Sequence, residues 1–294
     1  MTSHQLSTIN YQLSIINYQL KKIMCEYTAK DYKKGQPRWC PGCGDHFFLA
    51  SLHKAMAEIG KAPWENAVIS GIGCSSRASG YLDFNTVHSA HGRAIPVATG
   101  VKLAEPKLNV IVLTGDGDAT AIGGNHFIHA CRRNIDLTVV VYNNSIYGMT
   151  GGQYSPMTPY HSKATTAPYG MIEPDFNLAE LAKAAGATFV ARCTTFHAQM
   201  LSDLIVKGIQ HKGFSLIEAV SACPISFGRQ NKRGGPAEMM MWQRDHAVPV
   251  AAWDKLPEEK REGKFPIGVL YQVEGRKEYT EAYDELIAMA QGGK

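Results

Sequence analysis

Two apolar segments of the sequence end in polar residues that can bind a metal ion. Residues 110–113 lead into a Gly-Asp-Gly turn centred on Asp116, and residues 137–141 lead into an Asn-Asn pair that ends with Asn144. The interval between them suits one crossover, so we expect a right-handed βαβ unit whose parallel strands end at one sheet edge. The oxygens of Asp116 and Asn144 would then be neighbours. Such hard ligands hold Mg²⁺ and leave its other positions for phosphate oxygens and water.

The glycines of this turn favour phosphate binding, because they let backbone N–H groups approach phosphate oxygens. A Gly-Asp turn alone is ordinary loop chemistry. Its combination with the Asn-Asn pair is more specific, since 25 residues separate Gly117 from Asn143. The arrangement resembles the signature of enzymes that bind thiamine diphosphate, in which GDG is followed by NN after such an interval.

Cysteines in turns and after strands form a second candidate site. Cys40 and Cys43 flank a Pro-Gly turn that brings both sulfurs to one side of a loop, as tetrahedral metals and iron–sulfur clusters require. Cys74 and Cys223 each follow a predicted strand, and so does Cys193. The residues alone leave open which of these binds, and whether the site holds structural zinc or an iron–sulfur cluster.

The elements that must position these residues alternate between strands and helices. We expect strands at residues 66–72, 110–113, 137–141, 188–191 and 214–220. We expect helices in the crossover and at residues 45–59, 95–105, 178–185, 197–211 and 279–290. This alternation predicts an α/β fold, a parallel sheet flanked by helices, with ligands bound at the carboxyl edge of the sheet.

Two long loops are expected at that edge. Residues 75–93 are rich in Gly and Ser and carry Arg77, His88, His91 and Arg93. We interpret His88 as a solvated loop residue. Residues 156–174, rich in Pro, Thr and Tyr, are expected to form a long ordered loop, which is of the kind that wraps a partner.

The amino-acid composition indicates which classes of protein the chain resembles. The chain has 294 residues, 45% hydrophobic and 19% charged, which is typical of a globular protein. Its basic residues are scattered apart from short clusters such as Lys33 and Lys34, so the sequence favours no nucleic-acid partner. It has no apolar run of membrane-spanning length, so we expect no membrane partner. Seven cysteines without a secretory signal indicate a reducing, cytoplasmic location.

We expect three parts along the chain. Residues 7–13 are echoed by 14–20, and we expect residues 1–23 to be a disordered or non-native leader, with a short partner-binding segment as the alternative. Residues 24–227 would form the cofactor-binding domain. Residues 228–294 hold too little apolar sequence for their own core, so we expect an extension that packs on the same domain or on partner chains.

Together the motifs resemble those of one family, the β subunits of 2-oxoacid:ferredoxin oxidoreductases, over residues 37–292. The matching motifs are WCPGCG at 39–44, SGIGCSSR at 70–77, HGRA at 91–94, ATG at 98–100, GDGD at 115–118, RRN at 132–134, YNN at 142–144, YGMTGGQ at 147–153 and CP at 223–224. Their joint order and spacing carry the resemblance, since each motif alone is common.

The resemblance implies cofactors and their ligands. A [4Fe–4S] cluster would be held by Cys40, Cys43, Cys74 and Cys223. Mg²⁺ would be held by Asp116, Asn144 and the backbone carbonyl of Ile146. The residues implied for binding thiamine diphosphate are Gly73, Cys74, His91, Gly115, Asp116, Gly117, Asp118, Asn144, Ile146, Tyr147, Gly148, Met149 and Thr150.

The resemblance also implies a reaction. A 2-oxoacid is oxidatively decarboxylated on thiamine diphosphate, coenzyme A accepts the acyl group, and the cluster passes electrons to ferredoxin. His91 and Arg93 would steady the diphosphate or the substrate, and Arg77 would pair with a substrate carboxylate. The glutamate that activates the cofactor's pyrimidine ring would come from an α subunit, so the chain alone should be inactive. Glu218 is expected to serve packing or hydrogen bonding instead.

Substrate identity depends on smaller features. The segment 227–232 and Gly151 resemble the 2-oxoglutarate branch of the family, with pyruvate or a branched-chain 2-oxoacid as the alternative. A non-oxidative thiamine diphosphate lyase would not need the cysteines. A cysteine-rich metal-binding or electron-carrier module would not need the paired GDG and NN motifs. The oxidoreductase interpretation accounts for both.

Overall fold

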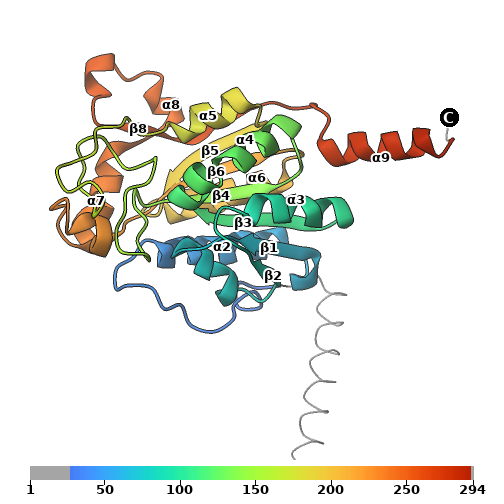
Figure 1. Ribbon diagram of the computed structural model, residues 1–294, viewed down its shortest axis with the longest axis horizontal. Coiled ribbons are helices and arrows are strands. Elements are labelled where there is room, and N and C mark those ends of the chain that lie inside the picture. The colour runs from blue at the N-terminus through green and yellow to red at the C-terminus, as the bar shows by residue number, and fades with distance from the viewer. Residues whose placement is uncertain (1–26, 293–294) are drawn as a thin grey trace, which may run out of the picture.

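One mixed sheet organises the chain in the computed structural model, which describes residues 27–292 (Figure 1). The predicted leader, residues 1–23, lies outside the described residues. The strands are β1 (Asn66–Ser70), β2 (Asn85–His88), β3 (Asn109–Gly115), β4 (Thr138–Asn143), β5 (Phe189–Thr194), β6 (Ser215–Val220), β7 (Ala247–Pro249) and β8 (Phe265–Gln272). Their order across the sheet is β2-β1-β3-β4-β6-β5-β8-β7.

The sheet is parallel from β2 to β5, as predicted. Strands β3 and β4 are direct neighbours, and Gly115 of β3 lies opposite Tyr142 of β4. Both strands therefore end at the same edge, with Asp116 and Asn144 just beyond their ends. Strand β8 runs antiparallel to β5 and carries β7 beside it. The C-terminal segment thus extends the sheet rather than building a second one.

Helices cover both faces of the sheet (Figure 1). They are α2 (Asp45–Ile59), α3 (Ala94–Ala104), α4 (Gly124–Arg133), α5 (Leu178–Ala185), α6 (Ala198–Gln210), α7 (Pro236–His246), α8 (Val250–Trp253) and α9 (Tyr279–Ala290). The short 3₁₀ and π-helical pieces are η1 (Pro63–Glu65), η2 (Ser75–Tyr81), η3 (Asp118–Ile122), η4 (Pro224–Gly228) and η5 (Glu258–Lys260).

Alternating strand residues build two separate cores. Ile111 and Leu113 of β3 point to the face covered by α2 and α6, where Phe48 and Leu204 pack. Their neighbours Val110 and Val112 point to the opposite face, which α3, α4 and α5 cover. Successive side chains of a strand alternate between faces, so one buried strand feeds both cores. The result is a three-layer α/β arrangement that holds the carboxyl ends of the strands in place.

Three sequence-based expectations were wrong. His88 belongs to the exposed edge strand β2 and not to a loop. The segment that contains it has no apolar run, because none of its side chains is buried, and so it carried no strand signal. Strand β5 continues to Thr194, beyond the predicted end at Ala191, and therefore includes Cys193. Strand β8 was not predicted, since Pro266 and Gly268 interrupt its apolar pattern.

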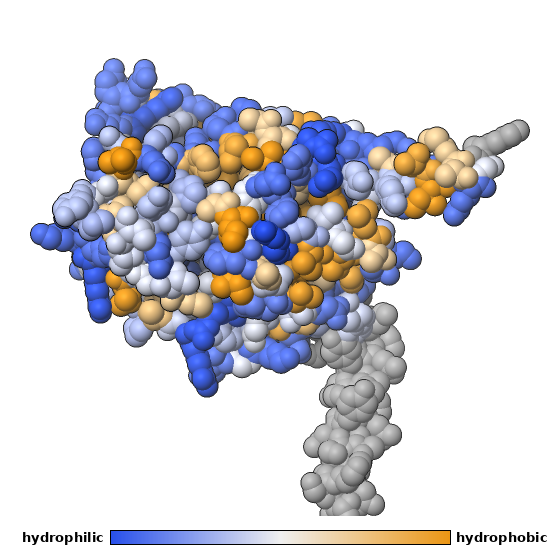
Figure 2. All heavy atoms as spheres, in the orientation of Figure 1, coloured by the Kyte–Doolittle hydropathy of each residue, from blue (hydrophilic) through white to orange (hydrophobic). Residues whose placement is uncertain are grey.

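Helix α9 extends away from the body of the molecule (Figure 1), and hydrophobic residues gather on it in Figure 2. Tyr283, Leu286, Ile287 and Met289 are 44%, 58%, 39% and 66% exposed. Helices of about this length are marginal in water without packing. Over residues 27–292, no helix combines the length and apolar character needed to cross a membrane.

Candidate functional site

Asp116 and Asn144 line one pocket at the carboxyl edge of the sheet. All of the residues that the family resemblance implied for the cofactor lie around this pocket, joined by Ile72 and Ser75, which the sequence did not single out. The lining residues are Ile72, Gly73, Cys74, Ser75, His91, Gly115, Asp116, Gly117, Asp118, Asn144, Ile146, Tyr147, Gly148, Met149 and Thr150. We call this the GDG pocket.

Asp116 is 2% exposed, and both its carboxylate and its backbone carbonyl accept hydrogen bonds from the protein. Ser155 Oγ donates to its Oδ2 at 2.5 Å, and Thr120 Oγ1 donates to its backbone carbonyl at 2.7 Å. Burial raises the pKa of Asp116 to about 7. A divalent cation bound there would offset this burial by stabilising the charged form. The donor set therefore fits a hard cation such as Mg²⁺. Ser155 was missed because it lies far from the motif in sequence.

The two asparagines after β4 have different partners. Asn143 points back into the fold, where its Nδ2 donates to Glu218 Oε1 at 2.8 Å. Arg192 Nε donates to the other oxygen of Glu218 at 2.7 Å, so Glu218 serves hydrogen bonding as predicted. Asn144 lies on the pocket wall, and its Oδ1 accepts a bond from the backbone N–H of Ile146 at 3.3 Å. Only Asn144 is thus directed to the cofactor side.

Asp118 is committed to the protein although it lines the GDG pocket. One of its oxygens accepts from the backbone N–H of Gly92 at 2.6 Å and also contacts His91 Nδ1. Its other oxygen accepts from Thr114 Oγ1 at 2.7 Å. Asp118 therefore orients His91, and its own contact with a cofactor would be secondary. A Cβ at Gly71 would lie 1.9 Å from Asp118 Oδ2, so this glycine leaves room for the carboxylate.

Tyr147 closes one side of the GDG pocket. Its hydroxyl donates to the carbonyl of Gly117 at 2.8 Å, and burial raises its pKa to about 12, which keeps the phenol protonated as a donor. The ring covers Gly117 so closely that a Cβ at that position would lie 2.2 Å from Tyr147 Cζ. Gly117 is therefore needed at this position because a larger residue would collide with the Tyr147 ring. A phosphate that approaches this backbone would add a second reason.

The four cysteines implied as cluster ligands line a neighbouring pocket, which we call the cysteine pocket. They come from the loop before α2, the end of β1 and the loop after β6. The lining residues are Arg38, Trp39, Cys40, Cys43, Cys74, Arg77, Asn144, Gly148, Met149, Cys223, Pro224, Ile225 and Ser226. A Cβ at Gly148 would lie 3.6 Å from Cys74 Sγ and 3.7 Å from Cys223 Sγ, so Gly148 borders both sulfurs.

Cys193 and Cys131 lie elsewhere in the fold. Both are fully buried in the hydrophobic cores, and Cys193 Sγ donates to the carbonyl of His197 at 3.7 Å. The structure thus separates Cys193 from Cys223, which the residue pattern alone left open and the family resemblance had already distinguished. Within residues 27–292, no group of three or more His, Cys, Asp or Glu side chains has the arrangement of a single-ion site.

Three thiols of the cysteine pocket, those of Cys43, Cys74 and Cys223, have a raised pKa. Burial is the main cause that raises the pKa of Cys43 and Cys223, and it raises that of Cys74 to about 12. The nearby carboxylate of Asp45 adds to each of these shifts. Metal binding replaces these protons, since thiolates are the ligands. Four thiols that come from distant segments and line one pocket fit an iron–sulfur cluster.

The two pockets share a wall. Cys74, Asn144, Gly148 and Met149 line both of them. A group in the GDG pocket and a cluster in the cysteine pocket would therefore be separated by single side chains. The arrangement can bring an organic cofactor and an electron acceptor into direct proximity.

The two arginines implied in catalysis lie outside the GDG pocket. Arg77 is exposed and lines the cysteine pocket, where its Nη1 donates to the carbonyl of Arg38 at 3.3 Å. Arg93 is exposed at the start of α3 and donates to the carbonyls of Gly92 and Ile122 at 3.3 and 3.2 Å. His91 is the one residue of the implied catalytic set that lines the GDG pocket.

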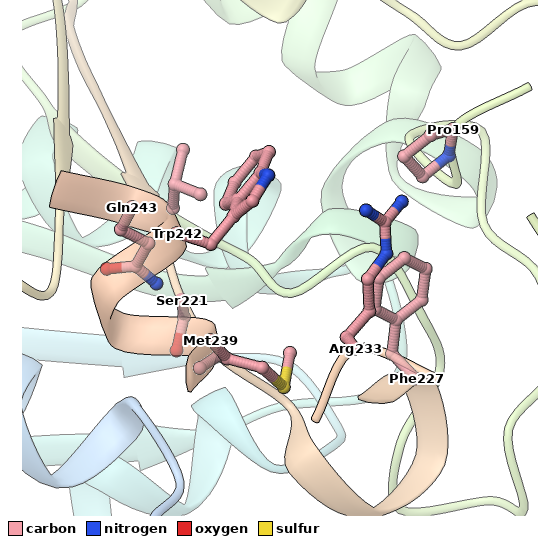
Figure 3. A pocket seen from close by; sticks show the side chains of 9 residues that line it. Pro159, Ser221, Phe227, Arg233, Met239, Trp242 and Gln243 are labelled. Carbon is pink, nitrogen blue, oxygen red and sulfur yellow. The ribbon is translucent and has the colours of Figure 1, made fainter. Parts of the chain in front are cut away.

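A further cavity, of about 200 Å³, lies behind the loop of Cys223 (Figure 3). Arg233 stacks over the Phe227 ring at 5.9 Å, and Met239, Trp242 and Gln243 of α7 form the other side. A Cβ at Gly228 would lie 2.7 Å from Met239 Sδ, which shows how closely α7 supports this loop. Helix α7 thus helps to hold Cys223 in place.

Comparison with known proteins matches this geometry. Residues 71–219 match the family described as thiamine pyrophosphate enzyme, C-terminal TPP binding domain. The chain is 50% identical over 249 residues to the 2-oxoglutarate synthase subunit KorB of Methanocaldococcus jannaschii, covering 85% of this chain and 92% of that protein. It is 43% identical over 227 residues to the 2-oxoglutarate oxidoreductase subunit KorB of Mycobacterium tuberculosis, covering 76% and 60%.

A solved structure is also similar. It is the 2-oxoglutarate:ferredoxin oxidoreductase from Magnetococcus marinus with 2-oxoglutarate, coenzyme A and succinyl-CoA bound. The TM-score is 0.80 at 35% sequence identity, covering 91% of this chain and 92% of that one. The likeness therefore spans the C-terminal segment as well as the cofactor-binding core.

Proposed function

The chain belongs to the β subunits of the 2-oxoacid:ferredoxin oxidoreductases, and from this premise we propose that it acts on 2-oxoglutarate. The reaction would be oxidative decarboxylation to succinyl-CoA and CO₂, with electrons passed to ferredoxin. The observation that carries the proposal is the wall shared by the two pockets, at Cys74, Asn144 and Gly148. It supports an oxidative reaction, since a lyase has no use for an adjacent electron acceptor.

In this proposal the GDG pocket holds thiamine diphosphate and Mg²⁺. Thiamine diphosphate supplies, when bound, the electron sink that allows a 2-oxoacid to lose CO₂. Asp116, Asn144 and the carbonyl of Ile146 would bind the cation. The backbone around Gly117 would approach the phosphates, and Tyr147 would keep this turn in place through its hydrogen bond. His91, oriented by Asp118, is the side chain available for proton transfer or for hydrogen bonding to the substrate.

The cysteine pocket would hold a [4Fe–4S] cluster through Cys40, Cys43, Cys74 and Cys223. Support comes from the position of these four residues, which belong to distant segments of the chain and line one pocket. Cys74 would connect the two sites, because it lines both pockets. A cluster in that position accepts electrons one at a time and delivers them to a second protein.

Two segments that resemble the 2-oxoglutarate branch contact each other. A Cβ at Gly152, next to Gly151, would lie 2.9 Å from Gln230 Nε2. Both glycines have positive φ, 118° and 88°, a conformation that favours glycine. The loop that covers the GDG pocket is therefore packed on the segment 227–232. The named substrates of the similar proteins add support, and pyruvate is the alternative.

An α subunit completes the site in this proposal. Glu218 is 2% exposed and paired with Arg192 and Asn143, so it is not placed to activate a pyrimidine ring. The activating glutamate would come from the partner chain, and thiamine diphosphate would lie between the two subunits. The chain alone should then show no turnover.

Anaerobic co-expression with the α subunit tests the proposal. We expect a brown complex with four irons per β chain, thiamine diphosphate that is released on chelation of Mg²⁺, and reduction of a viologen dye that requires coenzyme A. With 2-oxoglutarate the rate should exceed that with pyruvate or branched-chain 2-oxoacids. A colourless complex with one zinc would refute the redox proposal, and a faster rate with pyruvate would refute the substrate.

A further inference from the structure

The four cysteines of the cysteine pocket differ in exposure. Cys43 and Cys223 are buried, Cys74 is partly buried, and Cys40 is exposed. A cluster held by these residues would therefore come closest to solvent beside Cys40. An electron that leaves for another protein has its shortest path to the surface there.

Cations surround this point. Lys33, Lys34 and Arg38 precede Cys40 and are exposed, and the exposed Arg77 lines the cysteine pocket beside Arg38, to whose carbonyl its Nη1 donates. In Figure 2 the lower margin of the molecule, where Figure 1 draws this segment in blue, carries strongly hydrophilic side chains among apolar ones. The short sequence cluster Lys33/Lys34 thus belongs to a larger basic surface.

The backbone that carries these cations is fixed by Tyr81. The N–H of Lys34 donates to the Tyr81 carbonyl at 2.9 Å, and the N–H of Arg38 donates to the Tyr81 hydroxyl at 3.0 Å. The Trp39 ring meets the Tyr81 ring edge-on at 5.1 Å, and its Nε1 donates to the carbonyl of Cys74 at 2.8 Å. The basic surface is therefore held rigidly against the cysteine pocket.

In the described part of the chain, none of these four cations forms an ion pair. Other cations do: Lys102 pairs with Asp136 at 2.6 Å, and Arg192 with Glu218 at 2.7 Å. Two acids lie nearby, the partly exposed Asp31 on the same segment and the exposed Asp83 on the neighbouring one, so the four cations leave an excess of positive charge. A compact set of unpaired cations attracts an acidic partner and speeds its association.

We propose that Lys33, Lys34, Arg38 and Arg77 form the docking surface for an acidic iron–sulfur electron-carrier protein, which takes electrons at the Cys40 edge of the cluster. The inference rests on the proposed function and adds the place and charge of the contact. At each docking the reduced cluster loses one electron and the oxidised carrier gains it. Two oxidised carriers therefore accept the two electrons released from each 2-oxoacid.

The test uses the complete complex with the α subunit and an acidic ferredoxin. One variant carries Lys33→Gln and Lys34→Gln, which leave Arg38, Arg77 and the other residues of the pocket walls unchanged. The control carries Lys255→Gln and Lys260→Gln, which remove the same charge from the exposed segment between β7 and β8. That segment lies at the opposite edge of the sheet from the β2 side.

Ferredoxin binding is titrated at several salt concentrations, and reduction of ferredoxin and of a viologen dye is measured. We expect the first variant to bind ferredoxin roughly tenfold more weakly at low salt, with a shallower salt dependence. Its KM for ferredoxin should rise while the dye rate stays at the wild-type value. The control variant should match wild type.

Equal ferredoxin affinity in the two variants would overturn the docking surface. So would a parallel loss of dye reduction in the first variant, because the cations would then act on the cluster or the fold. Failure of the proposed function would give a different result from failure of the docking surface. In that case the wild-type complex itself would reduce neither the dye nor ferredoxin.

Discussion

The GDG pocket and the cysteine pocket share a wall but are built differently. The GDG pocket is formed largely by the ends of two adjacent strands, and Asp116, Asp118 and Tyr147 are already hydrogen-bonded to the protein. The cysteine pocket joins distant segments, which are held together by hydrogen bonds such as those from Gly44 N–H to the Ala222 carbonyl and from Trp39 Nε1 to the Cys74 carbonyl. The first pocket is built around carboxylates at strand ends, whereas the second is built around thiols on loops, and in the described chain no hydrogen bond joins these thiols to those carboxylates. Changes in one pocket should therefore affect the other little.

Of the variants proposed, Asp116→Ala should show the largest difference between its effects on the two pockets. The variant removes the one carboxylate oxygen donor to the cation, and no neighbouring carboxylate is free to replace it, because Asp118 is engaged. We expect the affinity for Mg²⁺ and thiamine diphosphate to fall by roughly two orders of magnitude. The iron content should stay unchanged. Calorimetric titration and iron analysis measure both. Asp83→Ala, an exposed control, should behave as wild type, and loss of iron in Asp116→Ala would contradict the independence of the pockets.

The converse change is Cys74→Ser, at the shared wall. We expect less than four irons per β chain and near-complete loss of ferredoxin reduction, while thiamine diphosphate still binds, because the Asp116 side is intact. Cys193→Ser is the matched control, since its thiol lies in the core and donates only to a carbonyl. Iron lost from the control but kept in Cys74→Ser would assign the ligand to Cys193.

A smaller effect is expected for Gly117→Ala. The new Cβ would lie 2.2 Å from the Tyr147 ring, so the loop that carries Tyr147 must move. Overpacking of this kind costs about 1–3 kcal/mol, and we expect it to appear as weaker thiamine diphosphate binding. Gly124→Ala is the control, because a Cβ there meets nothing within 4 Å. Identical affinities in the two variants would show that the loop does not constrain the pocket.

The smallest effect is expected for Asp118→Asn. An amide in this position must direct N–H toward one of the existing donors, Gly92, Thr114 or His91, which leaves buried donors unpaired. The free energy of unfolding should fall by about 1–3 kcal/mol, and kcat should fall more than KM rises, since His91 loses its orientation. Thermal unfolding and steady-state kinetics measure this. Asp254→Asn, exposed on the surface, provides the comparison.

The sequence correctly predicted the features that depend on the local pattern of apolar residues. Buried strands such as β3 and β4 show continuous apolar runs, and their ends placed Asp116 beside Asn144. The exposed strand β2 has no such run, and it was missed. The roles of Ser155 and Asp118 also could not be predicted, because they depend on which distant groups the fold brings to each oxygen. The residue pattern alone left Cys193 and Cys223 equivalent. The family resemblance selected Cys223, and the structure places Cys193 inside β5.

Helix α9 has a consequence for the production of this protein in a cell. Its exposed apolar residues, Leu286 and Met289 above all, have nothing in the described chain to cover them. Such a stripe favours self-association of a free chain. We therefore expect the β chain made alone to aggregate in proportion to its concentration. Matched synthesis of a partner that covers α9 would then set the yield of active complex.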